Sequence, residues 1–168
     1  MRKHVKGKTS MVSLEIPTEA KLLQAAGRVA LAHGQLEYSL RMTVKSISGL
    51  SVQEALDATA TMKVYELREK IKKLFKQKTR DESEKTRLDS LLNKAKRLSE
   101  ERNILIHRPW ARDSQGKWVV KEEDHTWGKS PSNEKLDQLA NNIWKVAIEL
   151  NAARLHGFIK EVLSGSKV

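Results

Sequence analysis

One short segment of the chain combines side chains that could bind an anion and move protons. Arg102, Asn103 and His107 lie within six residues of one another, just before Pro109. A guanidinium binds anions through several N–H groups, and an imidazole exchanges protons close to neutral pH. Residues 102–107 are therefore the part of the sequence whose composition best suits acid–base chemistry at an anionic group.

The apolar pattern places Arg102 where an apolar residue is expected. Asp81 and Glu84 predict the start of a helix that Pro109 ends at His107 or Arg108. Its apolar stripe, Leu88, Leu91, Ala95, Leu98 and Leu105, continues through position 102. An unpaired buried charge costs about 3–5 kcal/mol. We therefore expect Arg102 to face a carboxylate, a second subunit or a bound anion.

The same helix places Asn103 and His107 on one face, because they are four residues apart. Arg102 lies about 140° round the helix from His107. The long side chain of Arg102, and a helix end loosened by Pro109, could close that gap.

The rest of the pattern predicts an all-α protein, a four- to five-helix bundle with a small hairpin or flap inserted before the C-terminal helix. Spacings of three and four residues, with capping and turn residues between them, predict the elements. The expected helices cover residues 18–48, 51–60, 64–75, 82–108 and 131–163. Trp110, Trp118 and Trp127 lie in the flap, which either seals the core or covers one end of a binding site.

The charge is concentrated in one part of the chain. Of a net +11 over 168 residues, residues 63–112 contribute +8. Such a density is typical of a surface that contacts a polyanion, although a solvated helix face has the same composition. Aromatic residues make up only 5%, so phosphate contact fits better than base stacking. The residues expected to bind the phosphates of a nucleic acid are Arg68, Lys72, Lys73, Lys76 and Arg108.

Several classes of site are excluded or poorly supported. With no Cys, the chain has no disulfide, Cys-ligated metal or thiol nucleophile, and its five His show no metal-ligand spacing. We expect no metal or cofactor. His33 and Glu37 fit a hydrogen-bonded core pair better than a catalytic pair. No apolar run approaches a membrane span, so we expect a cytoplasmic single domain over 1–168 with a basic, flexible arm at 1–16.

Arg102, Asn103 and His107 resemble the motif of the HEPN superfamily of compact helical bundles. Members carry an Arg, a following polar residue that is often Asn, and a His four to six residues after the Arg near a helix end. Arg28 and His33 repeat the spacing, but Val29 replaces the polar residue and the pair lies in mid-helix. The resemblance covers residues 18–163 in a general way.

The resemblance implies a metal-independent endoribonuclease that works as a homodimer, of the toxin or defence type, with a cognate antitoxin or inhibitor as a partner. His107 would transfer protons, Arg102 would hold the phosphate and Asn103 would orient the substrate or the imidazole. The RNA 2′-hydroxyl would be the nucleophile, giving a 2′,3′-cyclic phosphate and a 5′-hydroxyl.

Other interpretations remain open at this point. A subgroup of the superfamily has a Tyr two residues after the His, where this chain has Pro109, so regulation through that Tyr is not expected. Some members have lost catalysis, and the alternative is a module that binds nucleic acid or a partner protein. His107 and Arg108 could also simply complement the negative end of a helix dipole.

Overall fold

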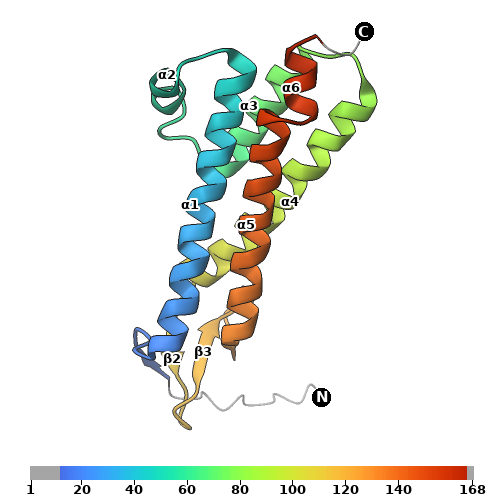
Figure 1. Cartoon of the computed structure of the whole chain (residues 1–168). Coiled ribbons are helices and arrows are strands. Elements are labelled where there is room, and N and C mark those ends of the chain that lie inside the picture. Colours follow the sequence, from blue (N-terminus) through green and yellow to red (C-terminus); the bar gives the residue numbers. More distant parts are fainter. Residues whose placement is uncertain (1–11, 166–168) are drawn as a thin grey trace, which may run out of the picture.

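The structure is a computed structural model that describes residues 12–165, and helices dominate it (Figure 1). Four helices are long: α1 (Ala20–Ser48), α3 (Val64–Lys76), α4 (Glu82–His107) and α5 (Asn133–Leu155). Two are short: α2 (Val52–Asp57) and α6 (Phe158–Leu163). The prediction of a helical bundle with a small β element before the C-terminal helix is confirmed.

Local sequence signals account for most of the helix ends. Ser51 and Glu54 form a reciprocal capping box at the start of α2, and the side chain of Asp81 accepts a hydrogen bond from the Ser83 N–H at the start of α4. Helix α1 ends at Gly49, whose φ of 72° is a left-handed conformation that glycine adopts without steric cost. The helix boundaries therefore follow from short-range chemistry.

Helix α4 runs antiparallel to α3 and crosses the bundle from one end to the other (Figure 1). Arg68 of α3 donates to Asn93 of α4 over 2.9 Å, and Lys72 lies 3.3 Å from Asp89, one turn earlier in α4. Helices α1 and α5 lie side by side in the same direction. The largest fully buried side chains come from every long helix, among them Leu36, Ile71, Phe75, Leu92 and Ile143.

A small antiparallel sheet covers the end of the bundle where α4 stops. Its strands are β1 (Ser13–Leu14), β2 (Trp110–Arg112), β3 (Trp118–Lys121) and β4 (Trp127–Lys129), paired in chain order. Trp110 and Trp118 pack edge to face with ring centroids 6.5 Å apart, and both pack against the core. These contacts favour the core-sealing interpretation of the flap.

Two features of the helices differ from the sequence-based prediction. The predicted last helix does not run unbroken to residue 163. It is interrupted at His156 and Gly157, and a separate short helix, α6, follows. This break lets Phe158 pack edge to face on Phe75, with centroids 6.1 Å apart. On α4, Leu92 rather than Leu91 is fully buried.

The predicted N-terminal arm also ends earlier than residue 16. Residues 1–11 lie outside the described part of the chain, whereas Ser13–Leu14 pair with Ala111–Arg112 of β2. Among the described helices, none has the length and apolar character of a membrane-spanning segment.

The packing predicts that Leu36→Ala destabilises the protein strongly, because Leu36 is 0% exposed in the centre of the bundle. We expect a loss of about 2–5 kcal/mol in the free energy of unfolding, measured by urea denaturation. Leu31→Ala is the matched control, since Leu31 on the same helix is 75% exposed. A similar loss for both variants would contradict the packing of α1.

Candidate functional site at the end of helix α4

Arg102 lies on the core-facing side of α4, as the sequence predicts, but without a carboxylate partner. Its side chain is half-buried, and its Nη1 atom donates to the Asn103 Oδ1 atom over 3.0 Å. Its Nε atom is buried without a hydrogen-bond partner. Within residues 12–165, no Asp or Glu forms an ion pair with Arg102. Most N–H donors of this partly buried guanidinium therefore have no hydrogen-bond partner within the described residues.

Asn103 contacts Arg102 and lies on the same helix face as His107. Both Asn103 and His107 are exposed, and on a regular helix residues four apart have Cβ atoms about 5–6 Å apart. The Asn103 oxygen accepts the hydrogen bond from Arg102. The structure therefore brings Arg102 and Asn103 into contact, whereas His107 shares the helix face of Asn103 and lies about 140° round the helix from Arg102.

The end of α4 is fixed by the β2 strand that follows it. The indole Nε1 of Trp110 donates to the Leu105 carbonyl oxygen over 3.1 Å, and the Arg108 N–H donates to the Ile104 carbonyl oxygen. These bonds occupy two of the carbonyl groups that a helix end leaves unpaired. His107 is thus the last helical residue of a well-anchored terminus.

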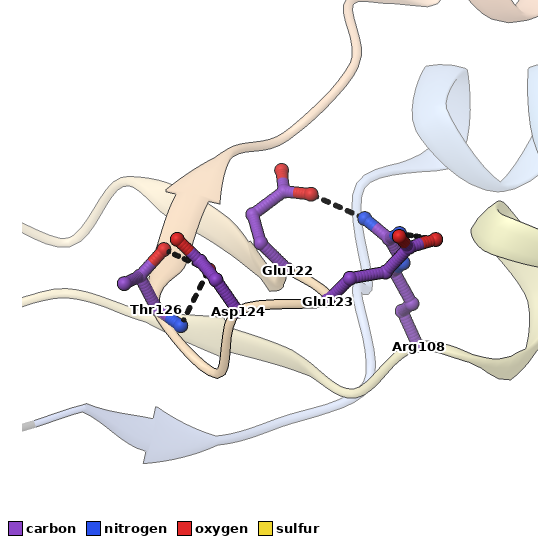
Figure 2. A network of polar contacts seen from close by, with 5 residues as sticks. All are labelled: Arg108, Glu122, Glu123, Asp124 and Thr126. Atoms are coloured by element: carbon purple, nitrogen blue, oxygen red, sulfur yellow. Dashed lines mark hydrogen bonds and ion pairs between the residues drawn. The ribbon is translucent and has the colours of Figure 1, made fainter.

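Arg108 differs from Arg102 because two carboxylates neutralise it. Figure 2 shows Glu122 and Glu123 directed toward Arg108 from the segment that follows β3. Glu122 pairs with Nη1, and Glu123 accepts from Nη2 over 3.0 Å. The ion pairs of Arg108 therefore hold the β3–β4 turn against the end of α4, and RNA binding by Arg108 stays a prediction.

The same turn depends on its own hydrogen bonds and on a glycine. Asp124 accepts from the Thr126 hydroxyl over 2.7 Å and from the Thr126 N–H over 3.0 Å (Figure 2), which holds the pKa of the Asp124 carboxyl below its usual value. A Cβ atom on Gly128 would lie 2.8 Å from Glu122 Cγ. Because Gly128 has no side chain, the Glu122 side chain can occupy this space and reach Arg108.

The predicted basic surface divides into buried and exposed residues. Arg68, predicted to bind RNA, is only 5% exposed and donates to Asn93, so little of its side chain is accessible to a ligand. Lys72 pairs with Asp89, whereas Lys73 and Lys76 are exposed. The Arg68 side chain thus joins α3 to α4 through its hydrogen bond to Asn93.

These lysines are also distant from the motif residues. Asp89, the partner of Lys72, precedes Arg102 by 13 residues on the same helix, which corresponds to about 20 Å. The structure therefore does not bring the α3 lysines and Arg102 together into one compact site. The α3 lysines lie beside α4 and Arg102 lies on it, so a ligand would have to be an extended polyanion to contact the lysines and Arg102 together.

Sequence reasoning missed two residues beside Arg102. His33 of α1 is 5% exposed, and its Nε2 atom lies 3.2 Å from the Ser99 Oγ atom of α4. Burial, and next the charge of Arg102, lower the pKa of His33, while Glu37 acts in the opposite direction. His33 and Ser99 are 66 positions apart, and no sequence signal joins them. The predicted pairing of His33 with Glu37 is present, with the His33 Nδ1 atom 3.7 Å from Glu37 Oε1.

The second Arg-His spacing in the chain proves unrelated. Arg28 lies 3.1 Å from Asp137 and contacts Asn141, both on α5, while His33 faces α4. The two residues of that pair therefore contact different helices. In the described residues, no three His, Asp or Glu side chains gather in a group that could hold a metal ion.

The crowding at Gly128 predicts that Gly128→Ala destabilises the protein by up to about 1 kcal/mol in urea denaturation, the size of a partly exposed ion pair. The added Cβ displaces Glu122 and removes one partner of Arg108. In a Glu122→Ala background, the same substitution should cost close to nothing. Gly34→Ala is the control, since a Cβ there meets no atom within 4 Å. Equal costs in both backgrounds would show that Glu122 does not occupy this space.

Comparisons with protein-family models, with curated proteins and with solved structures find no match to this chain. The resemblance to the HEPN superfamily accordingly rests on Arg102, Asn103 and His107 in a helical bundle. A fold of this kind supports more than one function. The chemistry of the α4 terminus is thus the basis for proposing what the protein does.

Proposed function

We propose that the protein is a metal-independent endoribonuclease whose site includes Arg102, Asn103 and His107. The observation that carries the proposal is the uncompensated guanidinium of Arg102, half-buried, hydrogen-bonded to Asn103 and five residues before an exposed imidazole on the same helix. A phosphodiester supplies the negative charge that no carboxylate of the described chain provides to Arg102.

The reaction follows from the side chains available. An imidazole removes the proton of the RNA 2′-hydroxyl, whose oxygen attacks the adjacent phosphorus. Arg102 stabilises the charge on the phosphoryl oxygens, and the P–O5′ bond breaks as the leaving oxygen is protonated. The products are a 2′,3′-cyclic phosphate and a 5′-hydroxyl, and no oxidant, reductant or metal is required.

The proton transfers favour a homodimer. One imidazole must be neutral to accept a proton while another must be protonated to donate one, and α4 itself carries a single His, whereas the other exposed His nearby, His125, lies in the β3–β4 turn. His33 is buried and does not supply the second imidazole. A second copy that packs against the end of α4 would supply the second His107. Ile104 and Ile106 flank His107 and are 39% and 42% exposed, which suits a surface covered by another chain.

A role in toxin or defence systems, with a cognate antitoxin or inhibitor, is part of the same proposal. It derives from the resemblance to the HEPN superfamily, since nothing in the described chain identifies the inhibitor or the RNA sequence that is cut.

Incubation of the purified protein with RNA in EDTA tests the activity. We expect cleavage by the wild type and a loss of about 10²–10⁴ in rate for His107→Ala, because proton transfer is removed. His156→Ala is the matched control, since His156 is also exposed but lies where α5 ends, at the opposite end of the bundle. Absence of cleavage by the wild type, or full activity of His107→Ala, would overturn the proposal.

The alternative function is a module that binds nucleic acid without cutting it, favoured by the exposed Lys73 and Lys76 on α3. RNA binding by the uncleaving His107→Ala protein should weaken with salt, and the slope should fall by about 2 when both lysines become Gln. Lys145→Gln on α5 is the control, with an exposed Lys elsewhere on the surface. An unchanged slope would show that α3 does not contact RNA.

A further inference from the structure

A polar cluster lies between α1 and α4 beside Arg102, and the proposed proton transfers do not use it. It consists of His33, Glu37 and Ser99. The imidazole of His33 is enclosed, with Nε2 3.2 Å from Ser99 Oγ and Nδ1 3.7 Å from Glu37 Oε1. A buried titratable group next to a functional cation is a candidate for a role at the site.

The cluster joins α1 to the turn of α4 that carries Arg102. Ser99 precedes Arg102 by three residues, so the two side chains are neighbours on the helix surface. The His33–Ser99 hydrogen bond thus fixes α1 against this turn, and the enclosed Nε atom of Arg102 limits the directions open to its guanidinium.

The charges around His33 make its protonation dependent on Arg102. Two charged groups face it: Glu37 on its own helix and Arg102 on α4, while Ser99 is uncharged. Burial lowers the pKa of His33 most, followed by repulsion from Arg102, and Glu37 partly offsets both. His33 is therefore neutral near neutral pH and does not repel the guanidinium.

We propose that His33 is a positioning residue of the Arg102 site and that its protonation is coupled to phosphate bound by Arg102. This inference rests on the proposed function, because it requires a phosphate at Arg102. A bound phosphate neutralises Arg102 and removes the repulsion that disfavours protonated His33. By linkage, protonation of His33 strengthens phosphate binding to the same degree. RNA binding should thus tighten as the pH falls through the titration of His33.

The coupling is measured by NMR titration of His33 in the full chain, with its signal assigned by its loss in His33→Gln. We expect the pKa of His33 to rise in Arg102→Gln. It should also rise in the wild type on addition of a 2′-deoxyoligonucleotide, which carries phosphates but no 2′-hydroxyl and so binds without being cut. The oligonucleotide should have no such effect on Arg102→Gln. Arg97→Gln is the charge control, since the Arg97 side chain is 73% exposed.

Binding gives a second readout that a purely structural His33 would not change. In a His107→Ala background, which removes titration of His107, oligonucleotide affinity should increase about 5-fold or more from neutral to mildly acidic pH. The increase should disappear in the His33→Gln, His107→Ala double variant. Gln retains an amide that can hydrogen-bond to Ser99, so the bundle should still fold.

The outcomes separate the two proposals. If the wild type cleaves RNA but neither Arg102→Gln nor the oligonucleotide alters the titration of His33, the coupling is wrong and the nuclease stands. If His33 responds as expected but the wild type cuts no RNA, the anion site stands and the proposed ribonuclease does not. If the acid-side gain in affinity survives His33→Gln, His33 has no role in binding.

Discussion

One electrostatic constraint shapes the end of α4: a guanidinium that is partly withdrawn from water and has no carboxylate to compensate it. Arg102 faces the core side of α4, its Nε atom is enclosed, and its hydrogen bond is to the neutral amide of Asn103. Arg108, which directly follows α4, is compensated by Glu122 and Glu123 of the β3–β4 turn. This contrast between two arginines six residues apart is the basis for proposing an anion site at Arg102.

The neighbouring elements hold the end of α4 in place without supplying a carboxylate to Arg102. Helix α1 supplies an uncharged, buried imidazole beside it rather than a carboxylate. The sheet anchors the end of α4 through Trp110, while Arg108 and the two glutamates hold the β3–β4 turn against the same terminus. The positions of Arg102 and His107 along α4 are thus set by helix geometry and by this anchored terminus.

Much of this arrangement could be predicted from the sequence because it depends on local chemistry. Helix periodicity and caps such as Ser51 and Asp81 predict the helices, and Pro109 predicts where α4 ends. Contacts between distant residues could not be predicted. A pattern rich in Lys and Arg does not reveal that Arg68 is buried against Asn93, that Arg108 is neutralised, or that His33 meets Ser99 beside Arg102. Those contacts depend on how helices pack, and they change which cations are free.

The most direct test of the central claim is the chemistry of the ends produced when the protein cuts RNA in EDTA. Attack by the 2′-hydroxyl on a phosphate held by Arg102 leaves 2′,3′-cyclic phosphate and 5′-hydroxyl ends, and Arg102→Ala should leave the RNA intact. Fragments with 3′-hydroxyl and 5′-phosphate ends, or the same cyclic ends from Arg102→Ala at the wild-type rate, would contradict the claim that this guanidinium acts on the scissile phosphate.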